Sequence, residues 1–217
     1  MKWSDQAWQA AEPVYKQILE MDFIRELMEG TLSRERFLFY IRQDAIYLVD
    51  YGKSLTGIAT RLCRFEHRDA FLSFAKDCMV AERVLHEYYL QKEDVVTKTG
   101  PTPSCLLYAS YLLKQTYDAP VEVAMASILP CFWVYKGVGE HLAANQNREN
   151  NPYQAWIDMY GGEEFDASVA KAIALCDEMA AEATEKQRQA MTHAYVLCTK
   201  MEWMFWDSAW RLEGWPV

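Results

Sequence analysis

Three groups of polar or reactive side chains interrupt apolar stretches of the chain and could do chemistry. In the first group, Asp44, Tyr47 and Tyr51 are spaced by three and four residues, so a helix would place a carboxylate and two phenols on one face. A carboxylate on a core-facing side must be hydrogen-bonded, paired with a charge or open to a cavity. From spacing alone, Asp44 could equally pair with an arginine of another helix or point to solvent.

The second group is Cys131 with Tyr135, four residues apart and directly after Pro130. A thiol and a phenol would then share one helix face. A thiol is a strong nucleophile when its pKa is lowered, so a catalytic Cys131 should have a lower pKa than the structural cysteines. The alternative is a buried thiol that serves only as a small core residue.

The third candidate is Glu202, which stands between Met201 and Trp203 and is followed by Met204, Phe205 and Trp206. If these rings exclude water from the carboxyl group, its pKa rises and it becomes suited to general acid–base catalysis. A Glu202 that faces solvent on an amphipathic helix is the competing interpretation.

Metal and nucleotide sites are not supported by the residue pattern. Glu82 and His86 are one helical turn apart, but a helical dinuclear site needs a second such pair, and the chain has only 4 histidines. The pair Gly161-Gly162 has no phosphate-binding context and indicates a turn. We therefore expect neither a metal nor an organic cofactor.

Apolar positions recur at helical spacing along nearly the whole chain, which predicts an all-α fold. We expect one domain over residues 1–217, because no linker or repeat divides the chain. Ser33 should begin a long helix and Gly30 should end a short one, while Pro130 should interrupt its helix. The clearest break is at residues 100–103. The predicted helices cover about 5–20, a short segment ending at Gly30, 33–63, 67–92, 104–116, 120–144, a short segment ending at Tyr160, 164–183 and 184–211.

Charge and composition restrict the partners. A net charge of -9 without a basic run disfavours nucleic acid and anionic membrane surfaces. No uncharged apolar segment reaches the roughly 20 residues that span a bilayer, and no signal peptide is recognisable. The 6 cysteines are scattered, as is typical of free thiols. We expect a cytoplasmic protein that acts on a small molecule.

Four separated segments of the chain form a recognisable set. They are Tyr40-Ile41-Arg42-Gln43-Asp44-Ala45-Ile46-Tyr47-Leu48, Leu129-Pro130-Cys131-Phe132-Trp133-Val134-Tyr135 continuing to Gly139-Glu140, Trp156-Ile157-Asp158-Met159-Tyr160-Gly161-Gly162, and Met201-Glu202-Trp203 leading to Arg211-Leu212-Glu213-Gly214-Trp215. Together they resemble the TenA/thiaminase II family in its cysteine-containing branch. The resemblance extends over essentially the whole chain, and its motifs occur in the family's order. It implies a haem-oxygenase-like helical bundle, a homotetramer, and hydrolysis of aminopyrimidines.

Transferred by position, the resemblance implies that Cys131 is the nucleophile, Glu202 the acid–base carboxyl group and Asp44 the carboxylate that recognises the aminopyrimidine. It further implies that the pocket is lined by Tyr47, Tyr108, Tyr135 and Tyr160. Tyr108 is matched through a weaker segment, in which Tyr111 is an alternative. The expected substrates are 4-amino-5-aminomethyl-2-methylpyrimidine, which would give the hydroxymethyl product and ammonia, and thiamin; the residues do not decide which of them is physiological.

Two other classes of function are compatible with such a scaffold. One is an oxidative enzyme related to haem oxygenase or to pyrroloquinoline-quinone synthase. Haem oxygenases take their iron ligand from the N-terminal helix, however, and this chain has no histidine before His67. The other is a regulatory protein, because the family name refers to transcriptional activation. The acidic charge makes direct binding to DNA unfavourable.

Overall fold

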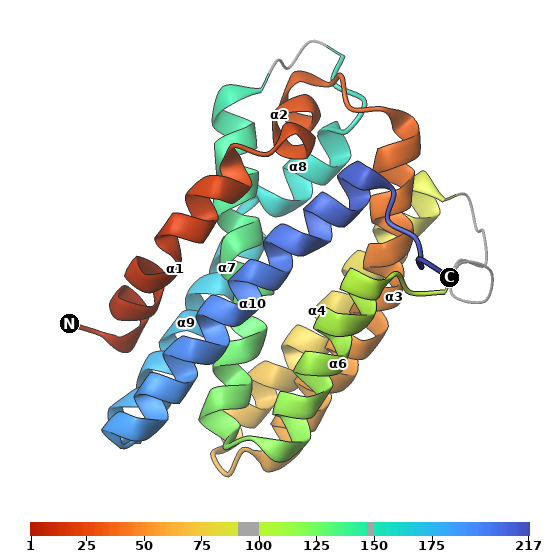
Figure 1. Cartoon of the computed structure of the whole chain (residues 1–217). Helices are drawn as coiled ribbons and strands as arrows, with labels where there is room; N and C mark the ends of the chain where they lie inside the picture. Colours follow the sequence, from red (N-terminus) through yellow and green to blue (C-terminus); the bar gives the residue numbers. More distant parts are fainter. Residues whose placement is uncertain (91–99, 147–149) are drawn as a thin grey trace.

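The computed structural model describes residues 1–90, 100–146 and 150–217, and the regular elements within these ranges are all α-helices. This confirms the all-α fold class. Figure 1 shows the helices packed around one another. They are α1 (Trp3–Leu19), α2 (Asp22–Glu29), α3 (Arg34–Arg61), α4 (Phe65–Tyr89), α6 (Pro103–Asp118), α7 (Val121–Asn145), α8 (Gln154–Tyr160), α9 (Glu163–Glu182) and α10 (Glu185–Arg211).

Local capping interactions set several of the helix ends. The Ser33 hydroxyl accepts a hydrogen bond from the Arg36 amide at the start of α3, and Gly30 ends α2 in the left-handed region at φ 75°. Thr184 begins α10 with a capping box to Gln187. The predicted caps at Ser33 and Gly30 are therefore confirmed. The predicted end of one helix at Lys92 lies outside the described residues.

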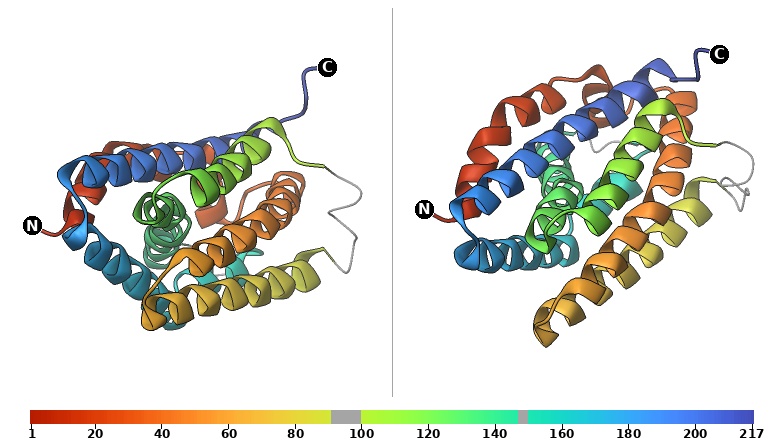
Figure 2. Two further views of the ribbon diagram at one scale, coloured as in Figure 1. Left: turned by 90° about the horizontal axis from the view of Figure 1, so that it is seen from below. Right: turned by 60° about the horizontal axis from the view of Figure 1, so that its bottom comes forward.

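Helix α7 occupies the centre of the molecule. In the left view of Figure 2 it is seen nearly end-on, with other helices on all sides of it. It packs against α10, α9, α8, α6 and α3. By length and composition α7 could also cross a membrane, but 72% of its most apolar window is buried inside the molecule, as in the core helix of a soluble protein.

Pro130 does not interrupt α7, contrary to the prediction from the sequence. The helix is continuous from Val121 to Asn145. A proline inside a helix removes one backbone hydrogen bond and costs about 3 kcal/mol when nothing compensates for it. Pro130 cannot donate to the Ala126 carbonyl, but it is buried among other side chains. Two residues earlier, the Tyr51 hydroxyl donates to the Ile128 carbonyl at 3.0 Å and attaches α7 to α3. Packing from the surrounding helices thus holds this segment in helical form.

Helix α8 lies directly against α7 at Gly139. A Cβ atom at this position would lie 2.5 Å from the carbonyl carbon and oxygen of Tyr160. Only a residue without a side chain allows the two backbones to approach so closely. Gly139 therefore determines where the C-terminal end of α8, and with it Tyr160, sits relative to α7.

The C-terminal tail, residues 212–217, forms hydrogen bonds to the beginning of α6 and to the residue just before it. The Glu213 carboxylate accepts hydrogen bonds from the Ser104 amide at 2.9 Å and from its hydroxyl at 3.0 Å. The Trp215 indole donates to the Pro101 carbonyl at 3.0 Å. The tail thus supplies an acceptor for the first turn of α6, which carries Tyr108 one turn further on.

Candidate active site

Cys131 lies at the wall of a cavity of about 490 Å³, between α3, α4, α7, α8 and α9. This size is within the usual range for small-molecule sites. Cys131 as a whole residue is partly exposed, whereas the residues around it on α7 are mostly buried. Tyr51, Cys78 and Tyr160 line the cavity together with Cys131. A ligand in the cavity would therefore meet a thiol and phenol rings.

Glu202 is buried behind Cys131, with 1% of its surface exposed. Its Oε1 accepts a hydrogen bond from the Tyr108 hydroxyl at 2.8 Å. The pKa of Glu202 is raised to about 8. Burial is the main cause of the rise, the hydrogen bond from Tyr108 opposes it, and the charge of Asp44 adds to it. The interpretation of Glu202 as a solvent-facing residue is excluded, and its carboxyl group is mostly neutral at pH 7.

Tyr47 contacts both Tyr108, which binds Glu202, and the Cys131 thiol. Its ring lies 4.9 Å from the Tyr108 ring and 5.6 Å from the Tyr51 ring, centroid to centroid. Its buried hydroxyl has no hydrogen-bond partner of ordinary length among the described residues, and its interaction with the Cys131 thiol favours the thiolate slightly. The hydroxyl is thus available to the thiol or to a ligand.

The pKa of the Cys131 thiol is raised well above its ordinary value, and the expectation of a lowered pKa is wrong. Burial is the main cause, followed by the negative charge of Glu202; the Tyr47 hydroxyl opposes them only in part. A thiolate needs a nearby cation or helix N-terminus, whereas this thiol sits in the middle of a helix among rings and carboxyl groups. Without a ligand, Cys131 is therefore a neutral thiol.

Asp44 and Tyr135 lie on the other side of the cluster. Asp44 is buried, with 3% of its surface exposed, which excludes the solvent-facing alternative. Its charge contributes to the raised pKa of Tyr135 and Tyr160, for which burial is the main cause. The Tyr135 hydroxyl accepts a hydrogen bond from Tyr40 at 3.3 Å, and its ring lies 5.0 Å from the Tyr160 ring.

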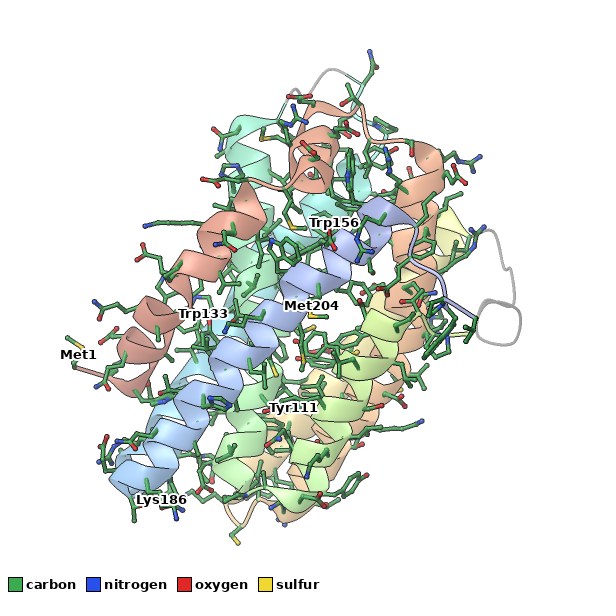
Figure 3. The ribbon with its side chains drawn as sticks, in the orientation of Figure 1. Met1, Tyr111, Trp133, Trp156, Lys186 and Met204 are labelled. Carbon is green, nitrogen blue, oxygen red and sulfur yellow. The ribbon has the colours of Figure 1, made fainter. Side chains whose placement is uncertain are left out.

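The structure brings the predicted residues into one cluster but divides them into two zones. Cys131 and Tyr160 line the cavity, whereas the others lie behind the cavity wall: Asp44, Tyr47, Tyr108, Tyr135 and Glu202. Of the two alternatives on α6, Tyr108 contacts Glu202. Tyr111, labelled in Figure 3, is only partly buried and is influenced by Cys198 instead.

Sequence reasoning missed some residues of this region. Tyr40 accepts a hydrogen bond from the Trp156 indole at 3.3 Å and donates one to Tyr135, so it supports the pocket from behind. Its position one turn before Asp44 was a usable signal. Asp77 and Glu164 line the cavity, but nothing in the local sequence distinguishes them from other surface carboxylates.

Within the part of the chain that the structure describes, no group of three or more His, Cys, Asp or Glu side chains is arranged to hold a metal ion. The side chains of Glu82 and His86 are not among those described. All 6 cysteines are free thiols.

Solved structures with the same fold cover nearly the whole chain. A TenA homologue from P. horikoshii OT3 matches with a TM-score of 0.87 and 25% identity, over 97% of this chain and 99% of that one. A domain from Shewanella denitrificans, described as having a heme oxygenase-like fold, matches with a TM-score of 0.73 and 15% identity, over 96% of this chain and 92% of that one. The haem-oxygenase-like fold is thus confirmed.

Curated relatives match over the same length of this chain. The thiamine biosynthesis multifunctional protein ThiED of Corynebacterium efficiens is 37% identical over 211 residues, which are 96% of this chain. The chain spans only 28% of the length of that relative. The aminopyrimidine aminohydrolase of Bacillus subtilis is 30% identical over 219 residues, covering 99% of this chain and 92% of the relative.

The model of the TENA/THI-4/PQQC family matches residues 8–212, which include every helix from α2 to α10 and most of α1. The match contains all the residues of the cluster around Cys131 and Glu202. The chain is therefore a member of the TENA/THI-4/PQQC family.

Proposed function

We propose that this chain is an aminopyrimidine aminohydrolase of thiamin metabolism. It converts 4-amino-5-aminomethyl-2-methylpyrimidine to the hydroxymethyl compound and ammonia, and it cleaves thiamin by the same route. The observation that carries the proposal is the neutral pair of Cys131 and Glu202, with the thiol at a cavity wall and the carboxyl group buried behind it. The name of the Bacillus subtilis relative supports this reaction.

In this proposal Cys131 is the nucleophile. An aromatic pyrimidine resists direct displacement at its exocyclic carbon, so its aromaticity has to be broken first. The Cys131 sulfur bonds to the ring carbon next to the substituted position, and the electron pair of the ring C=N bond moves to nitrogen. That nitrogen takes a proton from Glu202, and the carboxylate recovers one from the thiol. The net step adds S–H across C=N, so it begins from the neutral thiol that the structure contains.

The later steps restore the ring. Electrons from the ring nitrogen expel the leaving group from the exocyclic carbon, as ammonia or as the thiazole, and leave an exocyclic methylene. Water adds to this methylene. The bond between sulfur and the ring carbon then breaks, the nitrogen loses its proton, and Cys131 returns as a thiol. Apart from the substrate only water is consumed, and this route requires no metal or organic cofactor.

The remaining cluster residues recognise and position the ring. Asp44 is the carboxylate that binds the aminopyrimidine, and the phenols Tyr47, Tyr108, Tyr135 and Tyr160 surround it. Burial raises the pKa of all four phenols, so they remain hydrogen-bond donors at neutral pH. Because only Tyr160 of these lines the cavity, we expect the ring to enter beside Cys131 and to displace inner side chains as it reaches Asp44.

We further propose that the chain works in the cytoplasm as a homotetramer and binds neither nucleic acid nor membranes. The free thiols fit a reducing compartment. The net charge of -9 opposes binding to phosphate backbones. An exposed apolar row on α4, formed by Phe65, Leu72 and Met79, offers a surface for subunit contacts.

Two substitutions test the proposed roles, because they should fail differently. Cys131→Ala removes the only group that forms the adduct, so turnover should fall to near background while the pyrimidine still binds. Glu202→Gln keeps the shape and the bond from Tyr108, and it should lower kcat roughly 10²–10⁴-fold. The assays are ammonia release from the aminomethylpyrimidine and loss of thiamin, with pyrimidine binding measured by calorimetry.

Cys198→Ala is the matched control for the thiol. Cys198 is also buried close to Glu202, but it does not line the cavity, so kcat should stay within about twofold of the unsubstituted chain. Near-normal turnover by Cys131→Ala on both substrates would exclude the covalent mechanism. The absence of turnover by the unsubstituted chain would exclude the proposed reaction itself.

A further inference from the structure

One part of the cavity wall, here called the chamber, is apolar and contains none of Asp44, Tyr47, Tyr108, Tyr135 and Glu202. It carries the rings of Phe74, Phe132 and Phe165, from three different helices. The Phe74 and Phe132 ring centroids are 5.1 Å apart, and the Phe165 ring lies nearly parallel to Phe132, at 6.4 Å and 17°. Tyr160 meets Phe165 edge-on at 5.3 Å, which joins this chamber to the site beside the thiol.

Two carboxylates also line this cavity, from two different helices. Asp77 belongs to α4 and Glu164 to the first turn of α9. Neither has an ion-pair partner among the described residues, and no Lys, Arg or His stands among the described residues of the cavity wall. The lysine on α7 near the start of α9, Lys136, is paired with Glu140 and Asp166. The cavity therefore has a negative potential that no wall residue offsets.

We propose that this chamber is the subsite for the leaving group of the substrate, and that it selects a positively charged leaving group over a phosphorylated one. The inference rests on the proposed function, which places the pyrimidine ring beside Cys131. The substituent on the exocyclic carbon then points away from the inner cluster into the chamber. Asp77 and Glu164 are the specificity-determining residues.

Both features of the chamber favour an organic cation. The faces of aromatic rings attract cations, and flat heterocycles pack well against them. The unpaired carboxylates add a Coulomb attraction, which is moderate because Asp77 and Glu164 are exposed to solvent. A thiazolium or an alkylammonium group carries the matching charge. A phosphate ester on the same leaving group would instead meet two carboxylates without a counter-charge.

The test compares thiamin with thiamin diphosphate, which share the pyrimidine and the thiazolium but differ in the charge at the far end. Binding is measured by calorimetry on the Cys131→Ser chain, so that turnover does not interfere, with and without the additional pair Asp77→Asn and Glu164→Gln. We expect the pair to raise the Kd of thiamin about tenfold and to lower the Kd of thiamin diphosphate several-fold. Both changes in Kd should shrink at 0.5 M salt, because the Debye length is then only about 4 Å and the charges are screened.

The matched control is Asp69→Asn with Glu163→Gln, which removes the same charge from the same two helices outside the cavity wall. It should change either Kd less than twofold. Opposite effects on the two ligands cannot come from a general loss of structure. Equal changes for both ligands, or no change, would overturn the inference.

Turnover of the unsubstituted chain separates this inference from the proposed function. If the chain hydrolyses aminopyrimidines but the two carboxylates do not distinguish the ligands, only the leaving-group subsite is wrong. If it hydrolyses none of them while binding still responds to charge as expected, the reaction is wrong and the cation-selective chamber stands. If thiamin does not bind to the Cys131→Ser chain while the unsubstituted chain still releases ammonia from the aminomethylpyrimidine, the leaving-group subsite is wrong and the aminohydrolase reaction stands.

Discussion

Glu202 and Cys131 lie in a region of the core where neither side chain gains from carrying a charge. Burial is the main reason that both pKa values are raised, and ionisation of Glu202 would raise that of Cys131 further. The pair therefore starts the reaction with both protons in place. One proton can pass to the substrate while the other passes between the two side chains, so no isolated charge forms in the protein.

The pH–rate profile should reflect this requirement for a protonated Glu202. Since the pKa of Glu202 is about 8, its carboxyl group is neutral below that pH and ionised above it. We expect kcat/KM to fall as pH rises through about 8, and Glu202→Gln to lose this limb of the profile. The measurement is the rate of ammonia release between pH 6 and 10. A limb that persists in Glu202→Gln would assign the titration to another group.

The same carboxyl group should make the stability of the fold depend on pH. A folded-state pKa above the unfolded value means that the folded chain holds its proton longer, so the associated stability is complete below about pH 4.5 and is lost as pH rises through about 8. At about 1.4 kcal/mol per pKa unit, the loss amounts to several kcal/mol. The side chain of Glu202→Gln cannot ionise, so this variant does not lose that stability as pH rises.

Thermal unfolding at pH 5, 7 and 9 tests this linkage. The Tm of Glu202→Gln should rise relative to that of the unsubstituted chain between pH 5 and pH 9, because only the unsubstituted chain loses stability over this interval. Titration of the other groups cancels in the comparison. A Tm difference that stays constant with pH would show that Glu202 is not desolvated as the structure indicates.

At the scale of elements, the contact between α7 and α8 determines the position of Tyr160, which forms part of the cavity wall. Gly139→Ala would place a methyl group 2.5 Å from the Tyr160 carbonyl, and a backbone cannot yield as a flexible side chain can. We expect α8 to shift, the free energy of unfolding to fall by about 2–3 kcal/mol, and kcat/KM to fall with it as Tyr160 moves. Urea denaturation and turnover measure the two effects.

Gly52→Ala is the control for this substitution. Gly52 lies inside α3, and a Cβ atom there would have no neighbour within 4 Å. Alanine favours helix over glycine, so this variant should be more stable by about 0.5–1 kcal/mol and fully active. If Gly139→Ala behaved like Gly52→Ala, the close approach of α8 to α7 would not be what positions Tyr160.

At the scale of the whole molecule, α4 carries an exposed apolar row. Phe65, Leu72 and Met79 are seven residues apart, so they share one side of the helix, and they are 67%, 50% and 59% exposed. Exposed apolar patches mark interaction surfaces. The row is where we expect one subunit contact of the proposed homotetramer.

Leu72→Glu should weaken this assembly, because it places a charge in the middle of the row. Light scattering after size exclusion should show a smaller species for this variant and an unchanged species for Ser73→Glu, which adds the same charge beside the row. Circular dichroism checks that both variants remain helical. A monomer in the unsubstituted chain would exclude the homotetramer, and an unchanged Leu72→Glu assembly would place its contacts elsewhere.

Much of the fold could be predicted from the sequence because helices are specified by interactions between residues three and four positions apart. The cap at Ser33 and the terminating Gly30 depend on their own neighbours, and both were confirmed. The family could be recognised for a similar reason, since its motifs keep their residues and order along the chain. The single domain, the cytoplasmic location and the catalytic roles stay predictions.

The properties of the site were decided by the tertiary structure. Pro130 continues a helix because other helices pack around it. The pKa of Cys131 rises because the fold buries the thiol and brings Glu202 of α10 and Asp44 of α3 near it. Asp77 and Glu164 share a cavity although 87 positions separate them in sequence. Desolvation and electrostatic potential depend on every atom within several ångströms, whatever its position in the chain. The sequence alone therefore identified which groups could react, and only the packing of the helices determined their charge and what lies in front of them.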